Sequence, residues 1–190
     1  MTGRAVVTLD AALAALQRIA PLELAAEWDN VGLLVDPRGS RRRRVARVLL
    51  TIDLTAAVAR EARAFRADLV VAYHPVIFQP LRRLSAKDGK QGAVLELAAA
   101  GCAVWSPHTA LDAVPGGVAD WLADGVLAGD EAKSREPCGE GDFGRVVALP
   151  RDRVRRTRAP LQALPRRANV AGGTRRRSRA HGRRRRRRRH

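Results

Sequence analysis

The sequence predicts an α/β fold with a mostly parallel or mixed sheet and helices on both faces. Two observations predict it: short apolar runs typical of buried strands alternate with amphipathic helical patterns, and the connections between them are short. This pattern is confined to residues 1–150, which we expect to form one folded domain. Residues 151–190 are expected to form a disordered, arginine-rich tail.

The expected elements begin with a helix after Thr8, whose side chain can cap it, and Pro21 ends this helix. Three continuous apolar runs then predict buried strands. These runs are Arg47–Ile52, Leu69–Ala72 and Cys102–Trp105.

Three further helices are expected between and after these strands. The first follows Asp53-Leu54-Thr55 and places Val58, Ala62 and Phe65 on one face. The second spans about residues 91–100 and is stopped by Gly101. The last opens at Pro115-Gly116-Gly117 and runs through Trp121 and Leu122. Strand and helix thus alternate as in a largely parallel sheet.

The formal net charge of +17 belongs entirely to the tail. Residues 151–190 contain 18 arginines and one acid, Asp152, whereas residues 1–150 hold 18 basic and 18 acidic residues. Two interpretations of the tail stay open. It is an arm that binds nucleic-acid phosphates, or it is the product of a shifted reading frame in a GC-rich gene.

The two cysteines indicate a reducing compartment, so we expect a cytoplasmic protein. Cys102 lies in an apolar strand pattern and Cys138 in a polar loop, and neither has a partner at metal or redox spacing. No apolar run approaches the roughly 18 residues that span a bilayer, so no membrane partner is expected. The N-terminal apolar stretch is interrupted by Gln17 and Arg18, which argues against a secretory leader.

A candidate metal site comes from the histidines that follow two predicted strands. His74 and His108 sit at strand ends, where ligands bind in open α/β sheets, and Asp112 follows His108 at a metal-ligand spacing. These donors suit Zn, Fe, Mn or Co, and such a site supplies hydroxide at neutral pH. The alternative is that the histidines bond to the backbone and that Asp112 caps the turn before Pro115.

Four sequence blocks follow one another in a specific order: Glu27–Leu34, Thr51–Thr55, Ala67–Phe78 and Ser106–Val118. In this order they resemble the GTP cyclohydrolase type 2 homologue family, also described as Ngg-interacting-factor-like. The resemblance covers roughly residues 8–128.

This resemblance implies a two-lobed fold, a dinuclear metal centre, assembly into a homo-oligomeric, hexameric ring, and opening of the purine imidazole ring of GTP. His74, His108 and Asp112 match the family's ligands, and Tyr73 stands where many members have a further histidine. The family's closing segment with a His and a Glu has no counterpart here, which is the pattern expected of a truncated or frameshifted chain. We therefore expect at most one tightly held metal ion per chain and little turnover of GTP.

Several other residues carry two interpretations each. The resemblance suggests that Trp28 and Asn30 line a pocket, although a Trp beside an apolar run more often packs in a core. Asp53 either supports the metal ligands or caps a helix. Arg41–Arg44 is a solvated loop or faces a phosphate, and Gly116-Gly117 receives a phosphate or forms a turn.

Two classes of function follow. The chain is a metal-dependent hydrolase acting on a purine nucleotide, but with an incomplete ligand set. Alternatively, it is a non-enzymatic oligomeric binding or scaffold protein with structural metals and a nucleic-acid-binding tail. The sequence leaves its catalytic residues, its substrate and its status as an enzyme undetermined.

Overall fold

Four short strands form a mixed sheet in the order β1-β4-β3-β2. The computed structural model describes residues 7–39, 43–127 and 135–148. Its strands are β1 (Gly32–Val35), β2 (Val48–Thr51), β3 (Leu69–Ala72) and β4 (Ala103–Ser106). β2, β3 and β4 run parallel, and β1 pairs antiparallel with β4. The carboxyl ends of β2, β3 and β4 therefore share one edge of the sheet.

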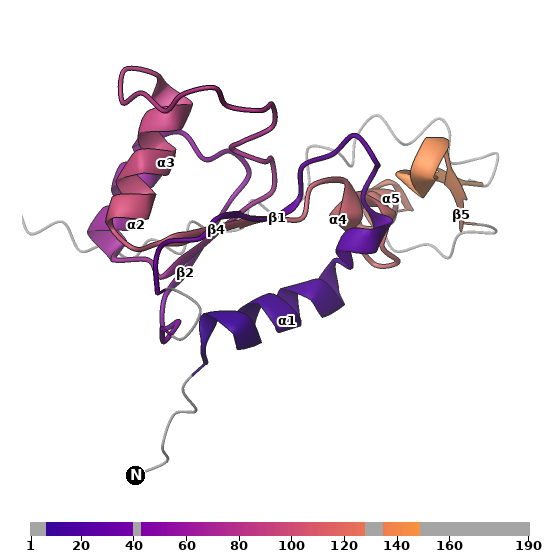
Figure 1. The fold of residues 1–190 in the computed structure, drawn as a ribbon. Helices are drawn as coiled ribbons and strands as arrows, with labels where there is room; N and C mark the ends of the chain where they lie inside the picture. Colours follow the sequence, from indigo (N-terminus) through magenta and orange to yellow (C-terminus); the bar gives the residue numbers. More distant parts are fainter. Residues whose placement is uncertain (1–6, 40–42, 128–134, 149–190) are drawn as a thin grey trace, which may run out of the picture.

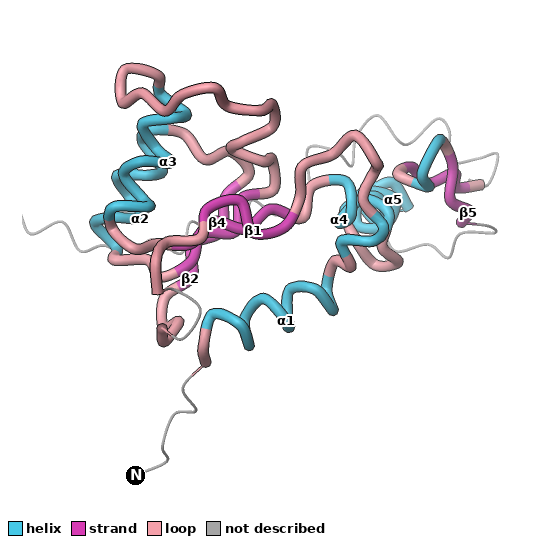
Figure 2. Tube along the Cα trace, in the orientation of Figure 1, coloured by secondary structure: helices cyan, strands magenta, loops and turns pink. Residues whose placement is uncertain are grey.

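Helices cover both faces of this sheet (Figure 1). α1 (Leu9–Ile19) lies on one face, and α2 (Ala56–Phe65) packs beside α3 (Gly89–Ala99) on the other. Alternate strand residues point to opposite faces. Val70 packs with Leu97 beneath α2 and α3, whereas Leu69 and Trp105 pack with Leu9 of α1. The sheet therefore lies between two hydrophobic cores. Figure 2 shows this sheet between the helices.

A smaller part of the molecule extends beyond β1 and β4 (Figure 1). It contains η1 (Leu22–Leu24), α4 (Thr109–Ala113), α5 (Val118–Leu127), and a hairpin of β5 (Arg135–Cys138) and β6 (Gly144–Val147) around η2 (Glu140–Asp142). Asp120 joins these elements because its Oδ1 accepts a 2.7 Å bond from Arg145 Nε and its Oδ2 a 2.5 Å bond from Gly116 N. Burial raises the pKa of Asp120, but the bonds from Gly116 and Arg145 outweigh it and hold the pKa below its ordinary value.

β2 is an edge strand with an uncovered face. The core under α1 is built from side chains of β1, β3 and β4, and no β2 residue belongs to it. Val48, Leu50 and Ile52 consequently lie exposed, with 75% of Leu50 accessible to solvent. The strand predicted over Arg47–Ile52 is present, but the prediction that it is buried was wrong, because α1 does not extend over β2. An exposed apolar edge strand is a ready surface for another protein chain.

The predicted α/β class, with helices on both faces of a mixed sheet, is confirmed. Thr8 caps α1, as expected, by accepting from Ala11 N. The helical face predicted for α2 was partly wrong, because Ala59 and Ala62 are the buried positions and Phe65 is half exposed. Cys138 lies in β5 rather than in a polar loop, while Cys102 is buried as predicted.

Within the described ranges, no helix has both the length and the apolar character needed to cross a bilayer. The predicted domain boundary at residue 150 and the predicted tail, 151–190, lie outside the described residues, so both stay predictions.

Candidate functional site

The two predicted histidine ligands follow neighbouring strands at the carboxyl edge of the sheet. His74 comes two residues after β3, and its N–H donates to Ile52 O at 3.0 Å, which continues the ladder past the strand end. His108 comes two residues after β4 and directly precedes α4. Because β3 and β4 are parallel neighbours, their chains deliver both imidazoles to one place. The two ring centroids are 5.7 Å apart.

A buried carboxylate holds His108 through one ring nitrogen. His108 Nδ1 lies 2.8 Å from Asp29 Oδ1 and 2.9 Å from Oδ2, and the Asp29 side chain has no exposed surface. Thr109 adds bonds from its N (3.2 Å) and Oγ1 (2.5 Å) to Asp29 Oδ2, and Asn30 N donates to Oδ1 at 2.7 Å. Burial raises the pKa of Asp29, but the bonds from Thr109, His108 and Asn30 outweigh it and lower the pKa.

The ionised Asp29 determines the tautomer of His108. A carboxylate only accepts hydrogen bonds, so Nδ1 of His108 must carry a proton, and in the neutral ring Nε2 keeps the lone pair. The same contacts hold His108 at φ 34° and ψ −120°, a conformation that non-glycine residues seldom adopt. Such strain persists only where surrounding contacts enforce it, and it clusters at functional sites.

His74 has a matching but more exposed partner. Its Nδ1 lies 2.8 Å from Asp53 Oδ1, with 48% of the His74 side chain and 63% of the Asp53 side chain exposed. The helix that follows is capped by Thr55, whose hydroxyl accepts from Val58 N. Of the two roles predicted for Asp53, the structure therefore shows support of the histidine and not helix capping.

Tyr73 binds the third predicted ligand residue. Its hydroxyl donates to Asp112 Oδ1 at 2.6 Å, and its carbonyl accepts from Ser106 Oγ at 2.9 Å. Burial, together with the bond to Asp112 and the charge of that carboxylate, raises the pKa of Tyr73. The phenol therefore stays protonated and orients Asp112.

Two aromatic rings flank His108 at the surface. Trp28 and Phe78 lie edge to face with ring centroids 6.2 Å apart, and their centroids lie 6.4 Å and 6.2 Å from that of His108. The prediction that Trp28 packs in the core was wrong, because 64% of it is exposed. Asn30 donates from Nδ2 to Ile77 O at 2.6 Å.

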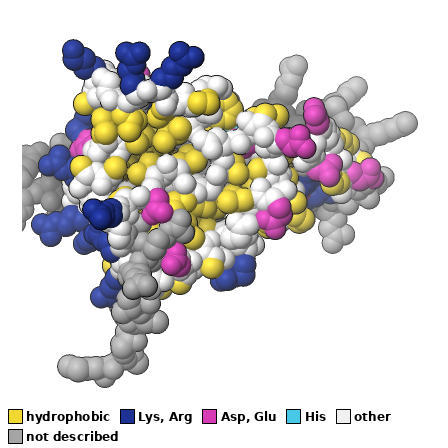
Figure 3. Space-filling view, viewed as in Figure 1, with side chains coloured by type: hydrophobic (Ala, Val, Ile, Leu, Met, Phe, Trp, Pro, Cys, Tyr) yellow, Lys and Arg dark blue, Asp and Glu magenta, His cyan; other side chains and the backbone are white. Residues whose placement is uncertain are grey.

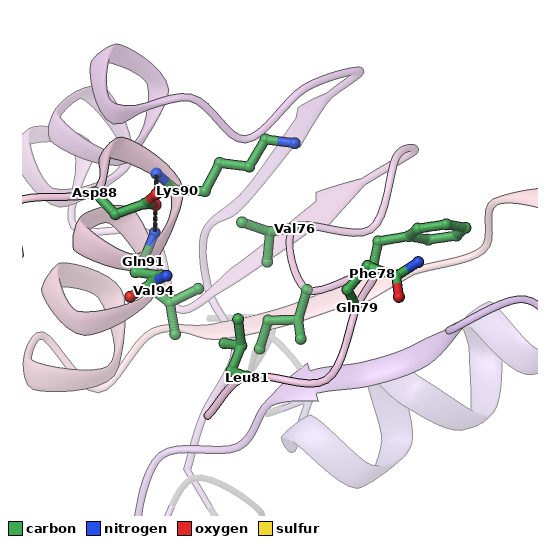
Figure 4. A pocket seen from close by; sticks show the side chains of 9 residues that line it. Val76, Phe78, Gln79, Leu81, Asp88, Lys90, Gln91 and Val94 are labelled. Carbon is green, nitrogen blue, oxygen red and sulfur yellow. Dashed lines mark hydrogen bonds between the residues drawn. The ribbon is translucent and has the colours of Figure 1, made fainter. Parts of the chain in front are cut away.

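Two cavities lie between the segment after β3 and the start of α3, and His74 lines one of them. One of about 330 Å³ is lined by Asp53, His74 and Lys90, among others. The next, of about 320 Å³, lies between the segment carrying Val76 and Phe78 and the start of α3. In Figure 4 Lys90 and Phe78 lie at opposite ends of this second cavity, with Val76 between them. Lys90 and Phe78 thus line the same cavity, and Lys90 also lines the cavity that contains His74.

Gly116 forms a turn, which is one of the two roles predicted for it. It lies at φ 78°, and its N–H is already bonded to Asp120 Oδ2. The structure thus brings His74 and His108 together and links Asp112 to them through Tyr73. No three His, Cys, Asp or Glu side chains among the described residues are arranged to hold a metal ion. The predicted ligand set stays a prediction.

Sequence reasoning missed Asp29 as a site residue. It lies 79 positions from its partner His108, beyond any local spacing rule. The available signal was its place in the block Glu27–Leu34, immediately before Asn30 and β1.

Comparisons with known proteins agree with one another. The profile of the family described as Duf34/NIF3 (NGG1p interacting factor 3) matches residues 7–170. The NIF3 homologue of Schizosaccharomyces pombe is 48% identical over 136 residues, covering 67% of this chain and 49% of that protein. NGG1-interacting factor 3 of Saccharomyces cerevisiae is 38% identical over 159 residues, covering 76% and 55%. The chain thus spans about half the length of these two relatives.

The fold is also similar to that of a solved structure. A Bacillus cereus protein related to NIF3 superposes with a TM-score of 0.62 at 26% sequence identity. The superposition covers 70% of this chain and 35% of that protein.

Proposed function

Because this chain belongs to the Duf34/NIF3 family, we propose that it is a divalent-metal-binding protein of the metal-dependent hydrolase type. The proposed ligands are His74, His108 and Asp112, with Zn, Fe, Mn or Co as the ion. The observation that carries the proposal is the pair of imidazoles, each held at Nδ1 by a carboxylate, with centroids 5.7 Å apart.

The donor chemistry of these residues fits a metal. Metal-binding histidines typically donate their second ring N–H to a carboxylate, which fixes the tautomer and aims the free nitrogen at the ion. Asp29 and Asp53 occupy that supporting position for His108 and His74. The Tyr73 hydroxyl occupies one oxygen of Asp112 and leaves the other for coordination. Two imidazoles and one carboxylate suffice for one ion but not for the family's expected pair.

The surroundings of the site favour a planar, anionic substrate, as a purine nucleotide is. Trp28 and Phe78 offer exposed aromatic faces next to His108, on which a base can stack. Lys90 lines the cavity next to His74, where its ammonium can bind a phosphate. A divalent ion held by the histidines would supply Lewis-acid chemistry to hydrolysis, as the label GTP cyclohydrolase type 2 homologue implies.

Metal retention by the full chain tests this proposal. We expect mass spectrometry after dialysis against Zn²⁺ or Co²⁺ to find at most one ion per chain, and His74→Ala and His108→Ala each to lose it. His190→Ala is the matched control and should retain it. Equal retention by His108→Ala and His190→Ala would contradict the proposal. GTP ring opening, followed by absorbance, is expected to be slow at most.

A second candidate function is a protein interaction scaffold. The budding-yeast relative is named NGG1-interacting factor 3, which indicates a protein partner for that protein. In this chain the uncovered edge strand β2 supports association, and we propose a second copy of the chain as its partner. Light scattering should then show an oligomer that Leu50→Asp dissociates and that Leu122→Asp, an exposed position on α5, leaves intact. A monomeric parent chain would refute this candidate.

A further inference from the structure

Four arginines line a cavity at the amino ends of the parallel strands, at the sheet edge opposite the histidines. The cavity measures about 290 Å³. The residues that precede β2, β3 and β4 directly, Arg47, Asp68 and Cys102, all line it. The further arginines are Arg43, from the segment before β2, and Arg63 and Arg66, from the end of α2. The fold thus gathers these arginines from separate segments.

Backbone contacts hold two of these guanidinium groups in place. Arg43 Nη1 donates to Gly101 O at 3.0 Å, and Arg47 Nε donates to Arg66 O at 2.7 Å. Each guanidinium carries five N–H donors, so most donors of both side chains stay free of the residues that the structure describes. The groups are therefore positioned by neutral acceptors and keep their full charge.

The cavity has an excess of positive charge. Asp68 is its one acidic lining residue, and its Oδ2 accepts from Ala46 N and Arg47 N at 2.9 Å each. Arg63 pairs with Glu96 at 3.4 Å. Within the described part of the chain, no ion pair joins Arg43, Arg47 or Arg66 to an acid. Like charges held this close repel one another, and a bound anion would relieve that repulsion.

We propose that this arginine cavity binds a small phosphorylated ligand through its phosphate oxygens. The planar guanidinium fork matches a phosphate in a bidentate manner, and several forks on one cavity favour a multiply charged group such as a diphosphate. A volume of about 290 Å³ lies at the small end of ligand sites, which run from about 300 to 1,000 Å³. That size fits a phosphate group better than a length of polymer.

The surface charge agrees with this placement. Most Lys and Arg side chains visible in Figure 3 lie on the half of the molecule that carries α2 and α3, whereas Asp and Glu side chains gather over the end with α5 and β5. The run Arg41–Arg44 was interpreted from the sequence either as a solvated loop or as a segment that faces a phosphate. Arg43 of this run lines the cavity. The histidines lie at the other edge of the sheet, so the two proposals stand or fall separately.

Titration calorimetry with inorganic pyrophosphate tests the proposal on the full chain, at a salt concentration that screens exposed charges. The double variant Arg43→Gln, Arg66→Gln removes two cavity charges. The control Arg82→Gln, Arg83→Gln removes two charges from the exposed loop before α3, and both proteins keep the same tail. We expect about tenfold weaker binding in the cavity variant and no change in the control.

Several results would overturn the proposal. Equal losses in the two double variants would assign binding to overall charge, and no loss in either would exclude the cavity. Binding of a single-stranded oligothymidylate that depends on Arg43 and Arg66, without pyrophosphate binding, would replace the small ligand with a nucleic-acid backbone. If the double variant melts early, Arg66→Gln alone repeats the test, because the Arg66 side chain makes no hydrogen bond or ion pair within the described residues.

Discussion

Replacing Asp29 with Asn changes one buried oxygen into an NH₂ group, and the structure allows no orientation that satisfies all neighbours. The NH₂ group would face His108 Nδ1 in either orientation, together with Asn30 N in one and with the N–H and hydroxyl of Thr109 in the other. Either choice sets donors against donors in a site with no exposed carboxylate surface. An unsatisfied buried donor costs about 1–3 kcal/mol, so we expect the variant to lose about 1–3 kcal/mol of folding free energy.

The chain provides a matched control in Asp53→Asn. It changes the same atom in the same kind of His contact, but 63% of the Asp53 side chain is exposed, so we expect a loss below about 1 kcal/mol. Urea denaturation of the full chain, followed by circular dichroism, measures both values. An Asp29→Asn loss no larger than the Asp53→Asn loss would refute the reasoning.

The same substitution should alter the chemistry of His108. With its Nδ1 no longer facing a carboxylate, the ring can shift its proton to Nε2 and lose the lone pair that a metal needs. Nitrogen NMR of the imidazole reports the tautomer directly, and supporting groups of this kind typically contribute tenfold to hundredfold in metal affinity. Retention of the Nδ1–H tautomer in Asp29→Asn would show that Asp29 does not determine it.

Two further predictions concern the stability of the fold. Leu97→Ala should lower the free energy of unfolding by about 2–5 kcal/mol, because Leu97 is fully buried. Leu50→Ala, on the exposed edge strand, should change it by less than about 1 kcal/mol, and similar values for the two variants would refute the assigned cores. The lowered pKa of Asp120 means that its carboxylate stabilises the fold above the ordinary value of 3.8 and loses this effect as the pH falls through the lower folded-state pKa. Asp120→Asn should therefore be less stable than the parent by about 3 kcal/mol at about pH 7. This difference in stability should narrow as the pH falls below 3.8, and a difference that stays constant there would contradict this origin.

Local sequence patterns determined the elements that carry the site. Continuous apolar runs predicted the three parallel strands, and β3 and β4 are buried as such runs indicate, whereas one face of β2 is exposed. The strand ends then predicted where His74 and His108 lie, since parallel neighbours finish at one edge. The hairpin β5–β6 was not predicted, because its two four-residue strands contain neither a continuous apolar run nor a polar–apolar alternation.

The partners of the site residues were decided by tertiary structure alone. Asp29 reaches His108 across 79 positions and Tyr73 reaches Asp112 across 39, because the sheet order places distant segments side by side. The exposure of Trp28 likewise depends on what packs over it, which no local pattern contains. The sequence by itself determined which donors stand at the strand ends. Only the fold decided which carboxylate or hydroxyl orients each donor, because hydrogen bonds form between groups close in space whatever their separation along the chain.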